Sequence, residues 1–341
     1  MTGWVELGNA NLYLSNVLRN GWLCAAAVAT IAQDGVGHQV CTMPATLENL
    51  LRDDLAALAL PIYLLAISLE ALLAFQLQRF QYHWRDSLAS LSMLLATGLV
   101  EILPKALALS AFVMLHEVSP LRDLVGRQWW AWVLLFFLDD LTYYWFHRAN
   151  HEVRLFWAGH VNHHSSEYLN FGTALRQGVG ERLHKYVFWL PLPLLGFDAL
   201  MVMTMMSFSL FYQFWVHTQW VQRLPNWFEA VFNTPSHHRV HHASNLGYLD
   251  RNHAGVLILW DKWFGTFAPE LDDEPCVYGL TTNIRSHNPI RVLTHEYVSL
   301  ARDMGRARRW SDRWRYLWKA PGWSHDGEDR RANVLRARLQ Q

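Results

Sequence analysis

The sequence predicts an all-α fold: an integral membrane bundle of about four transmembrane helices with a cytosolic, histidine-rich helical cap. Two observations predict it. Several apolar stretches reach the roughly 20 residues of helix that cross the hydrocarbon core of a bilayer. Three histidine clusters lie beyond the ends of these stretches, at spacings that place their side chains on one face of a helix.

Composition sets the broad class of the chain. It has 341 residues, of which 52% are apolar and 18 are tryptophan, and its formal net charge is zero. Zero net charge argues against a nucleic-acid partner, because binding to phosphates depends on an excess of Lys and Arg. We expect three regions: an N-terminal segment of unassigned role over 1–54, a membrane-embedded domain over 55–267 and a basic cytosolic C-terminal region over 268–341.

Three apolar stretches are interpreted as membrane spans. The first runs from Leu55 to Phe75, is broken only by Glu70, and predicts a transmembrane helix. The second, from Ser87 to Leu115, contains Pro104 and predicts a kinked span. The third, from Trp129 to Phe146, leads directly into the first histidine cluster.

A fourth apolar stretch runs from Tyr186 to Val216. It is interrupted by Pro191, Pro193 and Gly196, which leaves open whether it forms one tilted span or a helical hairpin. Arginines flank the histidine segments and crowd the tail from Arg302 to Arg338. Basic loops stay in the cytoplasm, which would place the histidine segments before and after this stretch on the same side of the membrane. The stretch would then have to enter the membrane and return, so the hairpin is favoured. The alternative, buried core helices of a large soluble α protein, fits the length and spacing of the stretches less well.

The histidine clusters supply the candidate site. Their spacings are HxxxH, HxxHH and HxxHH, so each cluster aims its imidazoles at one point, which predicts a metal site. The expected ligands are His147, His151, His160, His163, His164, His238, His241 and His242. His237 is also an i,i+4 partner of His241, so the choice between His237 and His238 stays open, although the HxxHH spacing favours His238.

The donor set favours two iron ions. A structural zinc site takes four ligands and usually recruits cysteine, whereas eight histidines suit two ions with open positions. Cys24, Cys41 and Cys276 lie far apart without a CxxC pair, so neither a disulfide framework nor a zinc knuckle is predicted. Carboxylates expected to orient imidazole N–H groups are Asp140, Glu152, Glu167 and Asp261.

Two segments resemble the fatty acid hydroxylase and sterol desaturase superfamily, closest to its alkylglycerol monooxygenase branch. They are DLTYYWFHRANHEVRLFWAGHVNHHSSEYLNFGTALRQ (140–177) and TPSHHRVHHASNLGYLDRNHAGVLILWDKWFGTF (234–267). The resemblance covers roughly 55–267 and implies that this region is a catalytic domain with a cytosolic, non-haem centre of two iron ions. It also implies an O2-dependent monooxygenase that hydroxylates a lipid C–H bond and, in that branch, cleaves the ether bond of alkylglycerols.

The resemblance adds one expected ligand and shows one position at which this sequence differs from its relatives. The family's motif falls on the eight histidines already named, and its lone histidine after the fourth apolar stretch falls on His217. We therefore expect His217 as a ninth ligand. The position after Asn252, often tyrosine in relatives, is His253 here, and we expect its side chain to hydrogen-bond in place of the tyrosine rather than to bind metal.

Electrons for the reduction of O2 must come from outside the chain, because the sequence has no HPGG haem segment, no CxxC ferredoxin pattern and no GxGxxG flavin fingerprint. The alkylglycerol monooxygenase branch implies tetrahydropterin as the donor, and the sterol and fatty acid branches imply a cytochrome or ferredoxin. Arginines such as Arg302 and Arg306 offer a surface for an acidic carrier or for anionic headgroups. Arginine far outnumbers lysine, which favours a bacterial inner membrane over the endoplasmic reticulum.

Two other functions stay open. A sterol or fatty-acyl desaturase or hydroxylase would share the same chemistry, since a change of about 1 Å in substrate placement decides the outcome. A non-redox metal transporter or lipid-binding membrane protein is the more distant alternative. Transport would place the ligands within the spans, whereas these clusters lie beyond them.

Overall fold

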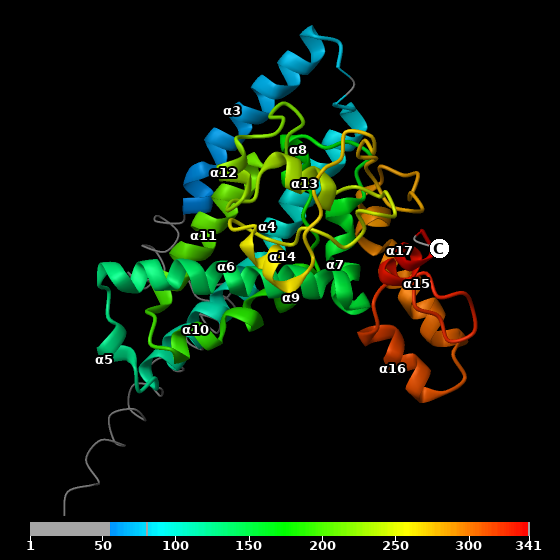
Figure 1. Cartoon of the computed structure of the whole chain (residues 1–341). Coiled ribbons are helices and arrows are strands. Elements are labelled where there is room, and N and C mark those ends of the chain that lie inside the picture. Colours follow the sequence, from blue (N-terminus) through cyan, green and yellow to red (C-terminus); the bar gives the residue numbers. More distant parts are fainter. Residues whose placement is uncertain (1–54, 80, 340–341) are drawn as a thin grey trace, which may run out of the picture. The chain divides into compact units, whose positions relative to one another are not determined.

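The computed structural model describes residues 55–79 and 81–339, which belong to one compact unit, Asp54–Gln341 (Figure 1). Its regular elements in this part of the chain are helices, and the extended pairings are two isolated bridges, Phe232 with Leu257 and Ala243 with Tyr278. The predicted all-α fold is confirmed. The expected N-terminal segment, 1–54, lies outside the described residues.

The described helices follow one another along the chain. In order they are α3 (Leu55–Gln76), α4 (Trp84–Glu117), α5 (Arg122–Val125), α6 (Trp129–Glu152), α7 (Arg154–His164), α8 (Phe171–Ala174), α9 (Glu181–His184), η1 (Lys185–Trp189), α10 (Pro191–Leu194), α11 (Ala199–Trp215), α12 (Asn226–Glu229), α13 (Pro235–His241), α14 (Leu259–Phe264), α15 (Pro289–Arg306), α16 (Trp310–Trp318) and α17 (Ala332–Leu339).

Helices α3 and α4 are long and apolar enough to cross a membrane. They coincide with the first two predicted spans, and α4 continues as one helix through Pro104. Only 17% of the apolar window of α3 and 11% of that of α4 is buried, so neither is the core helix of a soluble protein. Such exposed apolar helices require an apolar solvent, and the chain is therefore a membrane protein.

The third and fourth predicted spans are occupied by α6 and α11. Of the described helices, only α3 and α4 are both long and apolar enough to cross a membrane, so the count of about four spans stays a prediction. The fourth stretch breaks at Gly196, which has a positive φ of 92°. A Cβ at this position would lie 2.6 Å from the carbonyl oxygen of Leu121, so glycine permits the turn between α10 and α11.

Local sequence signals explain where the helices begin. Asp198 caps α11 by accepting from the backbone N–H of Leu200 at 2.9 Å. Asn288 caps α15 in the same way, and Pro289 occupies the first helical position, where its missing N–H costs nothing. Asn170 forms a capping box with α8.

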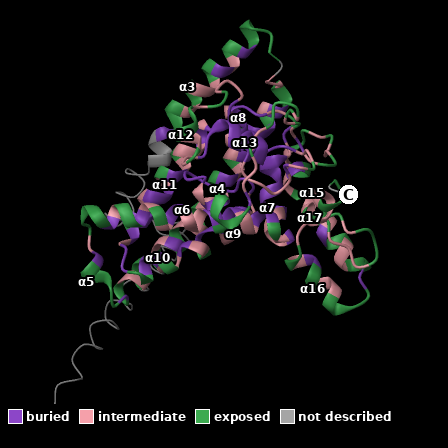
Figure 2. Ribbon diagram, in the orientation of Figure 1, coloured by how far each residue is buried: buried purple, intermediate pink, exposed green. Residues whose placement is uncertain are grey.

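The core lies between the transmembrane-type helices and the histidine-bearing ones. Buried apolar side chains from α4, α6, η1 and α11 form its largest cluster, including Phe112, Leu135, Phe146, Trp189 and Met201. Each such side chain contributes about 1.5–3 kcal/mol on burial. Figure 2 shows buried residues gathered around α7, α8 and α13, while α3 is largely exposed. The site region is therefore the most completely enclosed part of the described chain.

The C-terminal helices α15 and α16 brace α7. The buried guanidinium of Arg154, the first residue of α7, donates to Glu296 at 2.8 Å and pairs with Asp303 at 2.7 Å. Leu155 packs against a small buried cluster that contains Leu300 and Tyr316. This region thus packs onto the histidine-bearing part of the chain, and its predicted boundary at 268 stays a prediction.

We predict that Arg154→Gln destabilises this bracing. Removing the guanidinium leaves Glu296 and Asp303 without their cation, at a cost of roughly 2–4 kcal/mol once their partial exposure is discounted. The melting temperature of the purified protein in detergent should fall, and α15 should become more susceptible to limited proteolysis. Arg302→Gln, at an exposed position of α15, is the matched control. Equal melting temperatures for the two variants would contradict the bracing role.

Candidate metal centre

Nine buried histidines converge in two groups, and they are the nine that the sequence predicts as ligands. In each group the ring nitrogens all lie within 4.8 Å of one another. The larger group consists of His147, His151, His160, His164 and His241, and the smaller group consists of His163, His217, His238 and His242. We call them the five-histidine group and the four-histidine group.

Helix geometry explains how one cluster serves both groups. Residues i and i+4 lie about 40° apart around a helix, whereas residue i+3 lies about 60° to the other side. On α7, His160 and His164 therefore enter the five-histidine group while His163 turns toward the four-histidine group. At α13 the i,i+4 pair His238 and His242 enters the four-histidine group, while His241 turns toward the five-histidine group.

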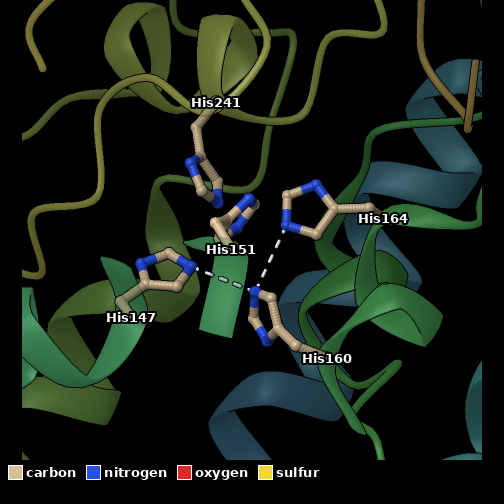
Figure 3. Close-up of side chains that lie close together, drawn as sticks. All are labelled: His147, His151, His160, His164 and His241. Carbon is tan, nitrogen blue, oxygen red and sulfur yellow. Dashed lines mark hydrogen bonds between the residues drawn. The ribbon is translucent and has the colours of Figure 1, made fainter. Parts of the chain in front are cut away.

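In the five-histidine group the rings point toward one another (Figure 3). The Nε2 atoms of His147 and His160 are 3.1 Å apart, and those of His160 and His164 are 3.3 Å apart. The Nε2 atoms of His151 and His241 are buried and have no hydrogen-bond partner among the described residues. Buried ring nitrogens whose lone pairs have no protein partner are what a metal-facing position requires.

The four-histidine group has the same inward arrangement. The Nε2 atom of His217 is 3.1 Å from that of His163 and 2.9 Å from that of His238. The Nε2 atoms of His238 and His242 are 3.0 Å apart. Nitrogens bound to one ion at about 2.1 Å lie about 3.0 Å apart on an octahedron and about 3.4 Å apart on a tetrahedron. The spacing in both groups therefore fits a bound transition metal.

The hydrogen-bond partners of the outer nitrogens explain why a cation is needed. The Nδ1 atoms of His147 and His160 donate to the carbonyl of His253 at 2.8 Å and to the carboxylate of Glu181 at 2.7 Å. A neutral imidazole carries a single N–H, so both Nε2 atoms present lone pairs to each other. Two lone pairs 3.1 Å apart repel unless a cation lies between them. The donor set therefore fits iron or another imidazole-binding metal.

The pKa shifts keep most of the nine histidines in the form that binds metal. Burial, followed by neighbouring imidazoles, lowers the pKa of several ligands well below 6.5; these are His147, His151, His163, His164, His238 and His242. Burial lowers the pKa of His217 to about 4 and that of His241 to about 3. All of these rings are neutral near pH 7, as ligands must be.

Two carboxylates that the sequence analysis did not identify orient the imidazoles. Glu181 accepts from Nδ1 of His160; burial raises its pKa, but this hydrogen bond and the charges of Arg182 and Lys185 lower it to about 2. Asp250 lies 3.2 Å from Nδ1 of His151, and burial raises its pKa to about 7. No spacing signal marks either residue, because neither lies on the helix of the histidine it contacts.

Within residues 55–79 and 81–339, none of the four carboxylates expected in this role hydrogen-bonds an imidazole of the two groups. Asp140 accepts from the backbone N–H groups of Val256 and Leu257, at 2.7 and 2.9 Å. Asp261 accepts from the backbone N–H of His253 at 2.8 Å. Both acids therefore shape the loop behind the site rather than the rings.

The two remaining acids lie at the surface. Glu152 pairs with Arg148 at 2.8 Å on the last turns of α6. Glu167 lines a small cavity of about 140 Å³ beside Arg285, away from the ligand rings. In this structure side-chain direction, and not proximity in sequence, decides which carboxylate reaches an imidazole.

The structure separates His237 from His238. His238 belongs to the four-histidine group. The ring of His237 faces the other way, with Nε2 3.9 Å from Glu229 and its ring centroid 5.4 Å from that of Phe267. The positions of the two rings therefore agree with the sequence-based preference for His238 over His237.

His253 departs from its expected role. Its side chain is fully buried, and both ring nitrogens lack a hydrogen-bond partner in the described part of the chain. Its ring centroid lies 5.0 Å from that of His151 and 5.8 Å from those of His147 and His241. The hydrogen bond that His253 does make at the site comes from its backbone carbonyl, which accepts from Nδ1 of His147.

Comparison with known proteins identifies a family-like region and several relatives. The model of the family described as fatty acid hydroxylase matches residues 132–266, which contain both histidine groups. The chain is 40% identical over 239 residues to an alkylglycerol monooxygenase of Danio rerio, covering 70% of this chain and 53% of that protein. It is also 40% identical over 238 residues to the alkylglycerol monooxygenase of Homo sapiens, covering 70% of this chain and 53% of that protein.

A fatty acid hydroxylase of a Lecanicillium species is 25% identical over 183 residues, covering 46% of this chain and 48% of that protein. The chain spans about half the length of these relatives. They are eukaryotic, so they give no support to the expected bacterial inner membrane. No solved structure matches the chain significantly. Residues 132–266 thus match the fatty acid hydroxylase family, and 70% of the chain is similar to alkylglycerol monooxygenases.

Proposed function

We propose that this chain is an O2-dependent, non-haem di-iron monooxygenase that hydroxylates a C–H bond of a membrane lipid. The observation that carries the proposal is the convergence of five and four buried imidazoles on two adjacent points. Exposed apolar helices next to this site support a substrate taken from the bilayer. The names of the relatives support a monooxygenase.

The chain's own residues prepare the two metal positions. The groups offer five and four nitrogens, fewer than the six that an octahedral ion accepts, so positions stay open for O2 and substrate. Bound iron would supply the activation of O2 and the removal of hydrogen from carbon. Glu181 holds the proton of His160 on Nδ1 and so keeps Nε2 free. Burial of all nine ligands, each at most 5% exposed, excludes water from the reacting atoms.

The substrate that we propose is a glyceryl ether. Hydroxylation of the carbon next to the ether oxygen gives a hemiacetal, which collapses to an aldehyde and glycerol. One oxygen atom of O2 enters the C–H bond and the other leaves as water, with two electrons and two protons from an external donor. For this substrate the donor is a tetrahydropterin, and the active site faces the cytosol.

A fatty-acyl or sterol hydroxylase or desaturase is the second candidate function. The family description and the Lecanicillium relative favour a fatty-acyl substrate. In that case a cytochrome or ferredoxin would be the electron donor. Turnover assays with an alkylglycerol and a fatty acid, each with tetrahydropterin or a reduced ferredoxin, separate the two.

We predict two iron ions per chain and their partial loss in His163→Ala. This substitution removes one of four nitrogens from the four-histidine group, so that group should lose its ion while the five-histidine group keeps its own. Alkylglycerol oxidation should stop. The matched control is His237→Ala, a buried neighbour of the ligands that belongs to neither group. Full iron content and full activity in His163→Ala, measured by elemental analysis and product formation, would end the di-iron assignment.

We predict that Glu181→Leu weakens iron binding or turnover by about 10- to 100-fold, because His160 loses the acceptor that fixes its tautomer. Glu181→Gln should be milder, since an amide oxygen still accepts from Nδ1. Glu152→Gln is the control, because Glu152 contacts Arg148 at the surface. Iron affinity is measured by competition with a chelator. The positioning role is wrong if Glu181→Leu and Glu152→Gln behave alike.

We predict that His253→Phe keeps both iron ions but binds azide more weakly than the unchanged chain. A buried polar group without a partner costs about 1–3 kcal/mol, so the His253 ring is expected to hydrogen-bond a non-protein ligand at the five-histidine group. Iron analysis and an optical azide titration test this. Unchanged azide affinity would refute the role, and loss of iron would make His253 a ligand.

A further inference from the structure

Helix α16 exposes three tryptophans on one face. Trp310, Trp314 and Trp318 are spaced i, i+4 and i+8, so they form a single stripe along the helix. They are 72%, 57% and 54% exposed, whereas Tyr316 on the inner side is 3% exposed. The helix therefore points an aromatic stripe away from the protein.

The neighbouring side chains leave the tryptophan stripe uncovered. The guanidinium of Arg313 lies 4.9 Å from the ring centroid of Trp310, and Phe156 meets the edge of Trp318 at 6.2 Å. The outer faces of the rings stay exposed among the described residues. A contiguous aromatic patch of this kind marks a surface that contacts something other than water.

Positive charge surrounds the stripe. Exposed basic residues at and around α16 are Arg306, Arg308, Arg309, Arg315 and Lys319. The acid within the helix, Asp312, is neutralised by Arg315 at 3.2 Å. Tryptophan rings between basic side chains match the bilayer interface, where the ring sits among the headgroups and the cations meet lipid phosphates.

The position of α16 allows it to reach a bilayer. The same chain carries the membrane-type helices α3 and α4, which hold the whole protein at a bilayer. Helix α16 is also attached to α7, because the backbone N–H of Arg154 donates to the carbonyl of Lys319 at 3.1 Å. Figure 1 shows α16, in orange-red, next to α15 and away from α3. Contact between α16 and lipid would therefore fix the histidine-bearing helix relative to the membrane surface.

We propose that α16 is an interfacial helix, which lies on the bilayer with Trp310, Trp314 and Trp318 in the headgroup region and its basic residues against anionic lipid. A lipid surface fits better than a redox protein, because an aromatic stripe flanked by cations on a helix attached to a membrane domain matches interfacial helices. The proposal does not depend on the reaction that the site performs.

The first test places a spin label at Trp314→Cys in the full chain, with the native cysteines replaced by serine, in nanodiscs of phosphatidylcholine and phosphatidylglycerol. The control is Asp326→Cys, whose side chain is 70% exposed in the loop that follows α16. We expect the label at 314 to be relaxed by O2, which partitions into lipid, and protected from a water-soluble nickel chelate. The label at 326 should show the reverse.

Two outcomes would overturn the proposal. Equal access of the nickel chelate to both labels would leave α16 in water, available to a protein partner. Protection of the label at 314 from both relaxants would mean that protein covers the stripe. Each result differs from the lipid-exposed signature that the proposal requires.

A second measurement tests the charges. Combined Arg309→Gln, Arg315→Gln and Lys319→Gln should abolish the difference in label depth between nanodiscs with and without phosphatidylglycerol, while the tryptophans remain. Arg223→Gln, on a side chain 45% exposed that pairs with Asp272, is the control and should leave that difference unchanged. No difference between the two lipid compositions in the unchanged chain would refute the role of the basic residues.

Discussion

The arrangement of this protein depends on one electrostatic constraint: imidazole Nε2 lone pairs meet at about 3 Å inside a buried space. Without a cation these contacts repel. With one, each nitrogen gains a bond that outweighs the loss of water. The outer Nδ1 atoms therefore need acceptors that fix the tautomer. The surrounding backbone supplies the carbonyls of His253, Arg251 and Gln213, and α9 supplies the carboxylate of Glu181.

Meeting this constraint requires that α7 be held firmly. Its last turns carry His160, His163 and His164, and its first residue, Arg154, is tied to α15 by two carboxylates. Apolar packing of Leu155 against Leu300 adds to this attachment. The C-terminal helices are thus part of the mechanical support of the site, which connects the site to the surface that we assign to lipid.

The apolar helices and the histidine site are physically linked. Helices α3 and α4 expose apolar side chains over most of their length, which is stable only in lipid. Helix α6 begins among apolar residues and ends with His147 and His151, so a single helix links the apolar part to the ligands. The lipid substrate that we propose would therefore reach this buried site from the bilayer without a long transfer through water.

The sequence by itself determined the all-helical fold, the first two membrane helices and eight of the nine histidines that the structure brings together, because helical periodicity is local and 20 apolar residues are visible without a structure. His217 came from the family resemblance. Only the tertiary structure decided that His163 separates from His160 and His164, and that Glu181 and Asp250, rather than Asp140 and Asp261, contact the rings. The physical reason is that ring orientation depends on how α7, α9 and the loop at 250 pack together, and those contacts join residues far apart in the chain.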